Sequence, residues 1–154
     1  MVYLGLGTNL GDKEQNLRMS IKKIEERIGN VVSLSAFYAT APWGFSSENS
    51  FLNAAVCVET TLLPLQVLET QRIERELGRT EKSVNGLYAD RLIDIDLLLY
   101  DDRVMDAEGL ILPHPLMTER RFVMEPLSEI APDVVHPVLH KTMKELFISS
   151  FSPQ

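Results

Sequence analysis

The sequence predicts an α+β fold in which helices pack against an antiparallel sheet. Apolar residues recur at helical spacing in one segment, Pro64 and Gly78 bound a second predicted helix, and several short segments have the residue types of strands. The expected order is strand, helix, strand, strand, helix, strand, followed by a mostly helical C-terminal part. This order is the double βαβ arrangement of a ferredoxin-like core.

The first half of this pattern begins with a buried strand at residues 2–6. A glycine-rich turn follows, in which Asp12 is suited to cap the next helix. That helix carries its apolar residues at helical spacing, at Leu17, Ile21, Ile24 and Ile28. It is expected to end at Gly29, and strands are expected at 31–38 and 51–60.

The second half begins with a helix that Pro64 opens and Gly78 ends. The polar segment 79–90 then leads into a strand at 92–100. The remaining expected elements are a short strand near Val104, a strand at 110–112, a helix at 119–130 interrupted at Pro126, and a helix at 141–149.

Length and composition limit the class of protein. With 154 residues and no linker-like segment, residues 1–154 are expected to form a single domain. The net charge of −7 argues against a nucleic-acid or anionic-membrane partner. No apolar run approaches the ~20 residues of a membrane span, and the N-terminus lacks a signal pattern, so a cytoplasmic location is expected. Cys57, the single cysteine, is expected to be a buried thiol.

The segment Arg91-Leu-Ile-Asp94-Ile-Asp96-Leu-Leu-Leu-Tyr100 carries the strongest chemical signal. Alternation places Asp94 and Asp96 on one side of a strand, roughly 7 Å apart at about 3.3 Å per residue. The opposite side is expected to hold Ile93, Ile95, Leu97 and Leu99. Two carboxylates so close repel each other unless a proton or a cation lies between them, and oxygen ligands suit Mg²⁺. The alternative is an exposed strand face with two aspartates.

Other candidate residues are individually weaker. Trp43 lies in a loop bounded by Pro42 and Gly44, where it either binds a ligand or covers the core. Phe51 and Asn53 share one strand face, where a ring and an amide can stack on a planar heterocycle and bind its edge, although the residues alone favour a place in the core for Phe51. The glycine-rich segment 5–12 lacks the lysine of a phosphate-binding loop and is more typical of a tight turn.

Taken together, the motifs resemble one family, the 6-hydroxymethyl-7,8-dihydropterin pyrophosphokinases. The matching segments are Gly7-Thr-Asn-Leu-Gly11, Thr40 to Gly44, Phe51 to Ala55, Gln71 to Glu74, Gly78-Arg79, Arg91 to Asp96, Pro113-His114-Pro115, Arg120-Arg-Phe122, Pro126-Leu and Glu129-Ile-Ala-Pro132. The resemblance covers nearly the whole chain. It implies the folate-pathway transfer of the β,γ-diphosphate of ATP to the hydroxymethyl oxygen of the pterin, with release of AMP.

The resemblance also implies a role for each matching residue. Asp94 and Asp96 would hold two Mg²⁺ ions on the ATP phosphates and, with Arg91, form the catalytic group. The pterin pocket would comprise Thr40, Pro42, Trp43, Phe51, Asn53 and Phe122, with Phe51 and Phe122 on the two faces of the ring. The ATP-binding residues would be Gln71, Glu74, Arg79, Lys82, Tyr88, Arg91, Leu97, His114 and Arg120. Positioning and charge stabilisation dominate transfers of this kind.

The sequence departs from the family pattern between residues 79 and 91. Glu81 stands where many members have a basic residue, and Tyr88-Ala89-Asp90 replaces a common Trp-Gly-Pro, so that Tyr88 would take the stacking role of that tryptophan. Two alternatives to the enzyme remain: a non-catalytic ferredoxin-like module that binds a metal or ligand, and a protein-interaction domain that uses the Trp43 loop. Production of AMP distinguishes the enzyme from both.

Overall fold

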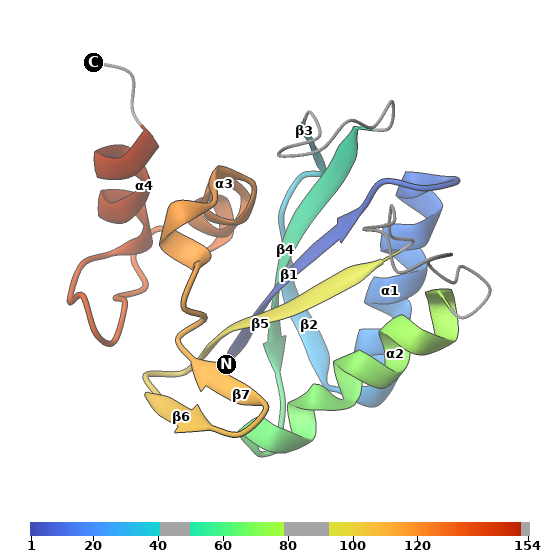
Figure 1. Ribbon diagram of the computed structural model, residues 1–154, viewed down its shortest axis with the longest axis horizontal. Helices are drawn as coiled ribbons and strands as arrows, with labels where there is room; N and C mark the ends of the chain where they lie inside the picture. Colours follow the sequence, from blue (N-terminus) through green and yellow to red (C-terminus); the bar gives the residue numbers. More distant parts are fainter. Residues whose placement is uncertain (41–49, 79–92, 152–154) are drawn as a thin grey trace.

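The computed structural model describes residues 1–40, 50–78 and 93–151 (Figure 1). Its strands are β1 (Val2–Thr8), β2 (Asn30–Leu34), β3 (Tyr38–Thr40), β4 (Phe51–Glu59), β5 (Asp94–Tyr100), β6 (Met105–Ala107) and β7 (Leu110–Leu112). Its α-helices are α1 (Lys13–Arg27), α2 (Glu69–Gly78), α3 (Arg121–Ile130) and α4 (Met143–Phe151), with short 3-10 helices η1 (Pro64–Leu68) and η3 (Met117–Glu119). No helix in these ranges is long and apolar enough to cross a lipid bilayer.

The main sheet is antiparallel, as the sequence predicts. Its strands lie in the order β2-β4-β1-β5, and β3 also pairs with β4. A separate hairpin of β6 and β7 lies beside β5 (Figure 1). The strand expected at 31–38 is instead two strands, because Ser35 interrupts the ladder. The Ser35 side chain is buried and accepts a hydrogen bond from the backbone of Ala55 at 2.8 Å.

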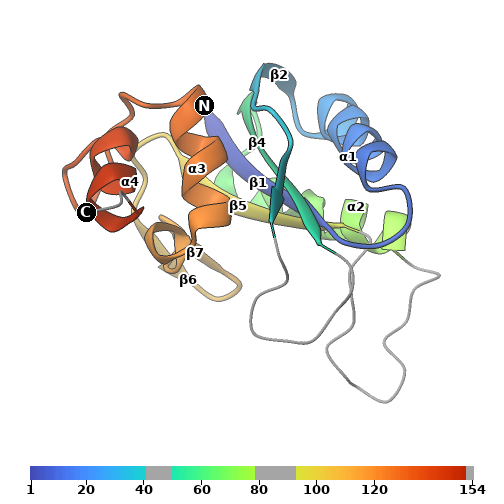
Figure 2. The same ribbon diagram turned by 90° about the horizontal axis from the view of Figure 1, so that it is seen from above.

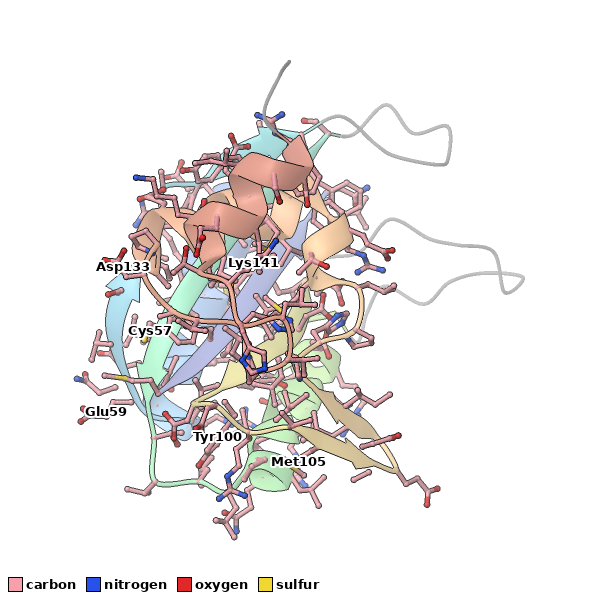
Figure 3. All side chains as sticks on the ribbon, turned by 90° about the vertical axis from the view of Figure 1, so that its left-hand side faces the viewer. Cys57, Glu59, Tyr100, Met105, Asp133 and Lys141 are labelled. Atoms are coloured by element: carbon pink, nitrogen blue, oxygen red, sulfur yellow. The ribbon has the colours of Figure 1, made fainter. Side chains whose placement is uncertain are left out.

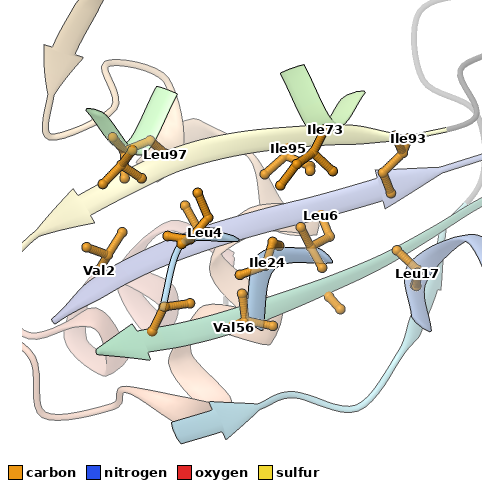
Figure 4. Close-up of a cluster of buried hydrophobic side chains, with 14 of the residues drawn as sticks. Val2, Leu4, Leu6, Leu17, Ile24, Val56, Ile73, Ile93, Ile95 and Leu97 are labelled. Carbon is orange, nitrogen blue, oxygen red and sulfur yellow. The ribbon is translucent and has the colours of Figure 1, made fainter. Parts of the chain in front are cut away.

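Helices cover both faces of this sheet. α1 and α2 pack on one face, and α3 and α4 lie on the other (Figure 2). The core on the first face comprises side chains from α1, α2, β1, β4, β5 and the residue before β5, including Leu17, Ile24, Ile73, Val2, Leu4, Val56, Ile93, Ile95 and Leu97 (Figure 4). The Asp12 carboxylate caps α1 by accepting from the Gln15 N–H at 3.1 Å, which confirms the expected cap.

The second face carries its own apolar core, which continues between α3 and α4. Cys57 lies on β4 at this side (Figure 3) and is only 4% exposed, so the expected buried thiol is confirmed. Burial raises the pKa of the Cys57 thiol.

A β-bulge changes the expected pattern of β5. Tyr3 pairs with Leu99 but Leu4 pairs with Leu97, so Leu98 is an extra residue in the strand. The prediction that Leu99 shares a face with Ile93, Ile95 and Leu97 is therefore wrong, since Leu99 joins Leu98 in the core beneath α3 and α4. The aspartates precede the bulge and keep their predicted side.

Two helix predictions also need correction. The helix predicted from Pro64 begins as the 3-10 helix η1 and becomes α-helical only at Glu69. The interruption predicted at Pro126 is absent, because α3 continues through Pro126 to Ile130. Pro126 is buried with neighbouring apolar residues of α3, and this packing offsets the hydrogen bond that its missing N–H would have made.

Candidate functional site

Two carboxylates project from the same side of β5. Asp94 and Asp96 are half-buried and alternate with the buried Ile95 and Leu97. Because Ile95 and Leu97 belong to the core under α1 and α2, the aspartates lie on the opposite face, the face of α3. The structure thus brings together the two residues that were predicted as metal ligands.

A third carboxyl group, that of Glu74 on α2, lies at the outer edge of β5. Its Oε2 accepts a hydrogen bond from the Ile95 N–H at 2.8 Å. Burial raises the pKa of Glu74 above its ordinary value, the Ile95 hydrogen bond opposes this shift, and the neighbouring Asp94 and Asp96 raise the pKa further. With a pKa raised to about 8, Glu74 is largely protonated at pH 7, and a cation bound by Asp94 and Asp96 would be stabilised by the two neighbouring carboxylates.

The oxygen ligands at this place fit a hard divalent cation. Carboxylate oxygens are preferred by Mg²⁺, which also keeps water or phosphate oxygens in its coordination sphere. In the part of the chain that the structure describes, no group of three or more His, Cys, Asp or Glu side chains is arranged to hold a metal ion by itself. Asp94 and Asp96 are therefore suited to share a cation with a phosphate-bearing ligand.

A cavity of about 480 Å³ lies along the outer edge of β5. It is bounded by the end of η1, by α2, by the β6–β7 hairpin and by residues 114–115. Its lining residues are Leu68, Thr70, Gln71, Glu74, Asp94, Ile95, Asp96, Leu97, Ala107, Gly109, Leu110, Ile111, His114 and Pro115. The size is within the range of about 300–1,000 Å³ that is usual for small-molecule sites. Four residues predicted to bind nucleotide, Gln71, Glu74, Leu97 and His114, line it together with both aspartates.

His114 is held rigidly at the rim of this cavity. Its backbone N–H donates to the Leu98 carbonyl at 2.9 Å, and its Nδ1 accepts from the Leu116 N–H at 3.2 Å. Burial lowers the pKa of His114, and the nearby Arg120 lowers it further, against an opposing effect of Asp94. The imidazole is therefore neutral at pH 7, with its proton on Nε2, because Nδ1 acts as an acceptor.

The predicted pterin residues of β3 and β4 form a second group. Asn53 is only 3% exposed, and its Nδ2 donates to the Thr40 hydroxyl at 2.9 Å. Thr40 pairs with Phe51 in the ladder, so these three side chains share the face of the sheet that α3 covers. This hydrogen bond fixes the orientation of the Asn53 amide, whose oxygen is an acceptor and whose nitrogen carries a second N–H.

Gly7 connects the two groups across the sheet. It pairs with Asn53 on one side and with Asp94 on the other. A Cβ on Gly7 would lie 3.0 Å from the Asn53 Oδ1, closer than a relaxed contact. The absence of a side chain at Gly7 therefore makes room for the Asn53 amide on the β1 strand, between β4 and the carboxylates of β5. The sequence reasoning missed this role, although a glycine inside a strand is a known signal of close approach.

The remaining described residues lie where the chain enters α3. The Arg120 guanidinium carbon lies 5.7 Å from the centre of the Phe122 ring, and both side chains are half-buried. α3 itself packs across β3 and β4. The other predicted residues, Pro42, Trp43, Arg79, Lys82, Tyr88 and Arg91, lie outside the described residues.

The chain matches one protein family over most of its length. The profile of the family 7,8-dihydro-6-hydroxymethylpterin-pyrophosphokinase (HPPK) matches residues 3–132. A 2-amino-4-hydroxy-6-hydroxymethyldihydropteridine pyrophosphokinase of Porphyromonas gingivalis is 50% identical over 140 residues, which are 89% of this chain and 94% of that protein. The chain belongs to the HPPK family. It is a pyrophosphokinase of folate biosynthesis with a pterin substrate.

Two further relatives extend the comparison. The HPPK of Aquifex aeolicus is 41% identical over 145 residues, which are 94% of this chain and 88% of that protein. A crystal structure of the HPPK-DHPS of Plasmodium falciparum with pteroate superposes with a TM-score of 0.75 over 98% of this chain. This chain spans only 42% of that protein at 17% identity, so the likeness concerns the fold alone. It supports the ferredoxin-like assignment.

Proposed function

We propose that the chain transfers the β,γ-diphosphate of ATP to 6-hydroxymethyl-7,8-dihydropterin at the face shared by β4, β1 and β5. The row Asn53, Gly7 and Asp94 carries this proposal. These residues are neighbours in one row across three strands. The Asn53 amide, which can bind the edge of a pterin, therefore lies on the same face as the Asp94 carboxylate, which can bind a metal ion on phosphate. The two substrates would meet above Gly7.

The pterin would lie on the face of the sheet above Gly7, beside the Asn53 amide. The Asn53 amide would bind the hydrogen-bonding edge of the heterocycle while Thr40 fixes the orientation of that amide. Phe51 and Phe122 would supply the apolar contacts to the two faces of the ring. Pro42 and Trp43 remain predicted members of this pocket.

The nucleotide would occupy the cavity beside β5. Gln71, Glu74 and His114 supply polar groups there, and Leu97 contributes to its apolar part. Arg120, together with the predicted Arg79, Lys82, Tyr88 and Arg91, would bind the phosphates and the departing AMP. Arginine is suited to this task because its planar guanidinium donates two parallel hydrogen bonds to phosphate oxygens.

In the reaction, the hydroxymethyl oxygen of the pterin attacks the β-phosphorus of ATP. A new P–O bond forms, the bond from the β-phosphorus to the α,β-bridging oxygen breaks, AMP leaves, and the hydroxyl proton passes to water. Asp94 and Asp96 would hold two Mg²⁺ ions, which supply charge neutralisation on the phosphate oxygens when bound. The chain itself aligns the two substrates, and such alignment is worth about 7–11 kcal/mol in well-oriented systems. We further propose a cytoplasmic location, where ATP is supplied.

A product assay tests the proposal. The protein is mixed with Mg²⁺, ATP and 6-hydroxymethyl-7,8-dihydropterin, and nucleotide products are separated chromatographically. We expect AMP and the pterin diphosphate in equal amounts. ADP would mean transfer of a single phosphoryl group, and the absence of both AMP and ADP would favour a binding module. Asp106→Ala on β6 is a control, because this exposed carboxylate lies outside the proposed site.

A further inference from the structure

Glu129, near the C-terminal end of α3, binds the segment that joins β2 to β3. Its Oε1 and Oε2 accept from the Ala36 N–H at 3.1 and 3.2 Å, and Oε1 also accepts from the Tyr38 hydroxyl at 2.5 Å. These contacts join residues more than 90 positions apart in the sequence. We call this set of three hydrogen bonds the Glu129 clamp.

On β3, the Glu129 clamp lies next to residues that are proposed to bind the pterin. Tyr38 is the ladder partner of Asn53. Two residues further along β3, the Thr40 hydroxyl accepts from the Asn53 side chain. A shift of β3 would therefore move the group that orients the Asn53 amide.

On α3, the Glu129 clamp shares a helix with Phe122, which is proposed to contact the other face of the pterin. Phe122 precedes Glu129 by seven residues, which is two helical turns and about 10.5 Å at about 1.5 Å per residue. Residues at this spacing share one helix face. Because a packed helix moves as a unit, a tilt of α3 at Glu129 would displace the Phe122 ring.

The clamp is not needed to hold α3 on the sheet. The buried Val123, Met124 and Leu127 anchor the helix in the apolar core. The Glu129 side chain is exposed at the surface, where polar pairs contribute little to stability. Its three hydrogen bonds are directional, however, and they restrain the angle between α3 and β3. The carboxylate also raises the pKa of Tyr38 to about 12, so this hydroxyl remains a donor at neutral pH.

We propose that Glu129 is a positioning residue for the pterin pocket, which it shapes by fixing α3 and Phe122 against β3 and the Thr40–Asn53 pair. Glu129 itself touches neither substrate in this proposal. The inference rests on the proposed placement of the pterin. It gives a role to the Glu129-Ile-Ala-Pro132 motif, to which the sequence assigned no chemistry.

The test compares Glu129→Ala with Glu125→Ala, which removes a carboxylate one turn earlier on α3. The Glu125 carboxylate pairs with Arg121 on its own helix, at 3.5 Å, and makes none of the clamp hydrogen bonds, although its charge also acts on Tyr38. Calorimetry measures the Kd for the pterin in the presence of a nonhydrolysable ATP analogue, and separately the Kd for that analogue. Thermal unfolding measures Tm.

For Glu129→Ala we expect the pterin Kd to rise about tenfold, which corresponds to about 1.4 kcal/mol of binding free energy. The Kd for the ATP analogue and the Tm should stay at the values of Glu125→Ala. Glu129→Gln keeps an oxygen for the Ala36 N–H and should restore part of the pterin affinity. Tyr38→Phe should weaken pterin binding in the same direction, and its effect should not add to that of Glu129→Ala.

An unchanged pterin Kd in both Glu129→Ala and Tyr38→Phe would overturn the inference. Equal losses of pterin binding, analogue binding and Tm would also overturn it, because they would indicate a general structural role. Failure of the proposed function has a different signature. The wild-type protein would then produce no AMP, whatever the Kd values of the variants.

Discussion

Substitution of Gly7 by alanine is expected to weaken pterin binding selectively. The added Cβ would lie 3.0 Å from the Asn53 Oδ1, so the amide must move by a few tenths of an ångström. That movement strains the 2.9 Å hydrogen bond from Asn53 to the Thr40 hydroxyl. The hydrogen bond of such a pair is worth about 0.5–1.5 kcal/mol. Since about 1.4 kcal/mol corresponds to a factor of ten, the pterin Kd should rise about two- to tenfold.

Gly5→Ala is a matched control on the same strand and the same face. Its Cβ would meet the Leu98 Cδ1 at 3.4 Å, which is an ordinary van der Waals contact. This variant should bind the pterin normally, and its free energy of unfolding should rise by about 0.4–1 kcal/mol or stay unchanged, because alanine restricts the unfolded chain.

The assay is calorimetric titration of both variants with the pterin and, separately, with a nonhydrolysable ATP analogue. Gly7→Ala should bind the analogue as the wild type does, because Gly7 is not among the residues that line the cavity beside β5. Normal pterin binding by Gly7→Ala, or an equal loss in Gly5→Ala, would refute the reasoning that Gly7 forms the floor of the pterin pocket.

Three further outcomes are expected. Asp96→Ala should abolish AMP production and leave the Tm unchanged, because the side chain faces the ligand side of β5; near-normal AMP production would disprove the metal assignment. Ile73→Ala should lower the free energy of unfolding by about 2–5 kcal/mol in urea titrations, since this side chain is fully buried, whereas the exposed Leu65→Ala should change it by less than about 0.5 kcal/mol. Burial lowers the pKa of His136 below 6.5, and its Nδ1 accepts two backbone N–H groups. As the pH falls through about 6.5, His136 of the unfolded chain binds a proton before His136 of the folded chain does. The contribution of His136 to the free energy of unfolding is therefore kept above this pH and decreases below it. Urea titrations should show this decrease, and it should be smaller in His136→Asn.

The parts of the fold that depend on local periodicity could be predicted from the sequence. α1 follows from its apolar spacing and its Asp12 cap, and the shared side of Asp94 and Asp96 follows from strand alternation. The register of β5 could not be predicted. The extra residue Leu98 is apolar like its neighbours, so nothing in the local pattern distinguishes a bulge from a continuous strand.

Contacts between segments that are distant in the sequence could not be predicted either. The sequence gives residue types at Glu129 and Tyr38, but their pairing depends on how α3 crosses β3. The division between β2 and β3 also depends on a distant contact. The Ser35 hydroxyl accepts a hydrogen bond from the backbone N–H of Ala55, twenty residues away, in place of a backbone carbonyl. Of the site residues, Asp94 and Asp96 on β5 were the easiest to predict, because strand alternation places two metal-binding carboxylates on one side of the strand.

The bulge in β5 separates the end of the strand that carries the site from the end that contributes to the core beneath α3 and α4. Before it, Asp94 and Asp96 face the α3 side and leave Ile95 and Leu97 to the core under α1 and α2. After it, Leu98 and Leu99 both join the core beneath α3 and α4. A regular strand would send Leu98 and Leu99 to opposite faces, and the core of α3 would lose one of them. Since α3 also carries Phe122, Leu98 helps to pack the helix that contributes this ring to the proposed pterin pocket. Asp94 and Asp96 lie before the bulge, so both still face the ligand side.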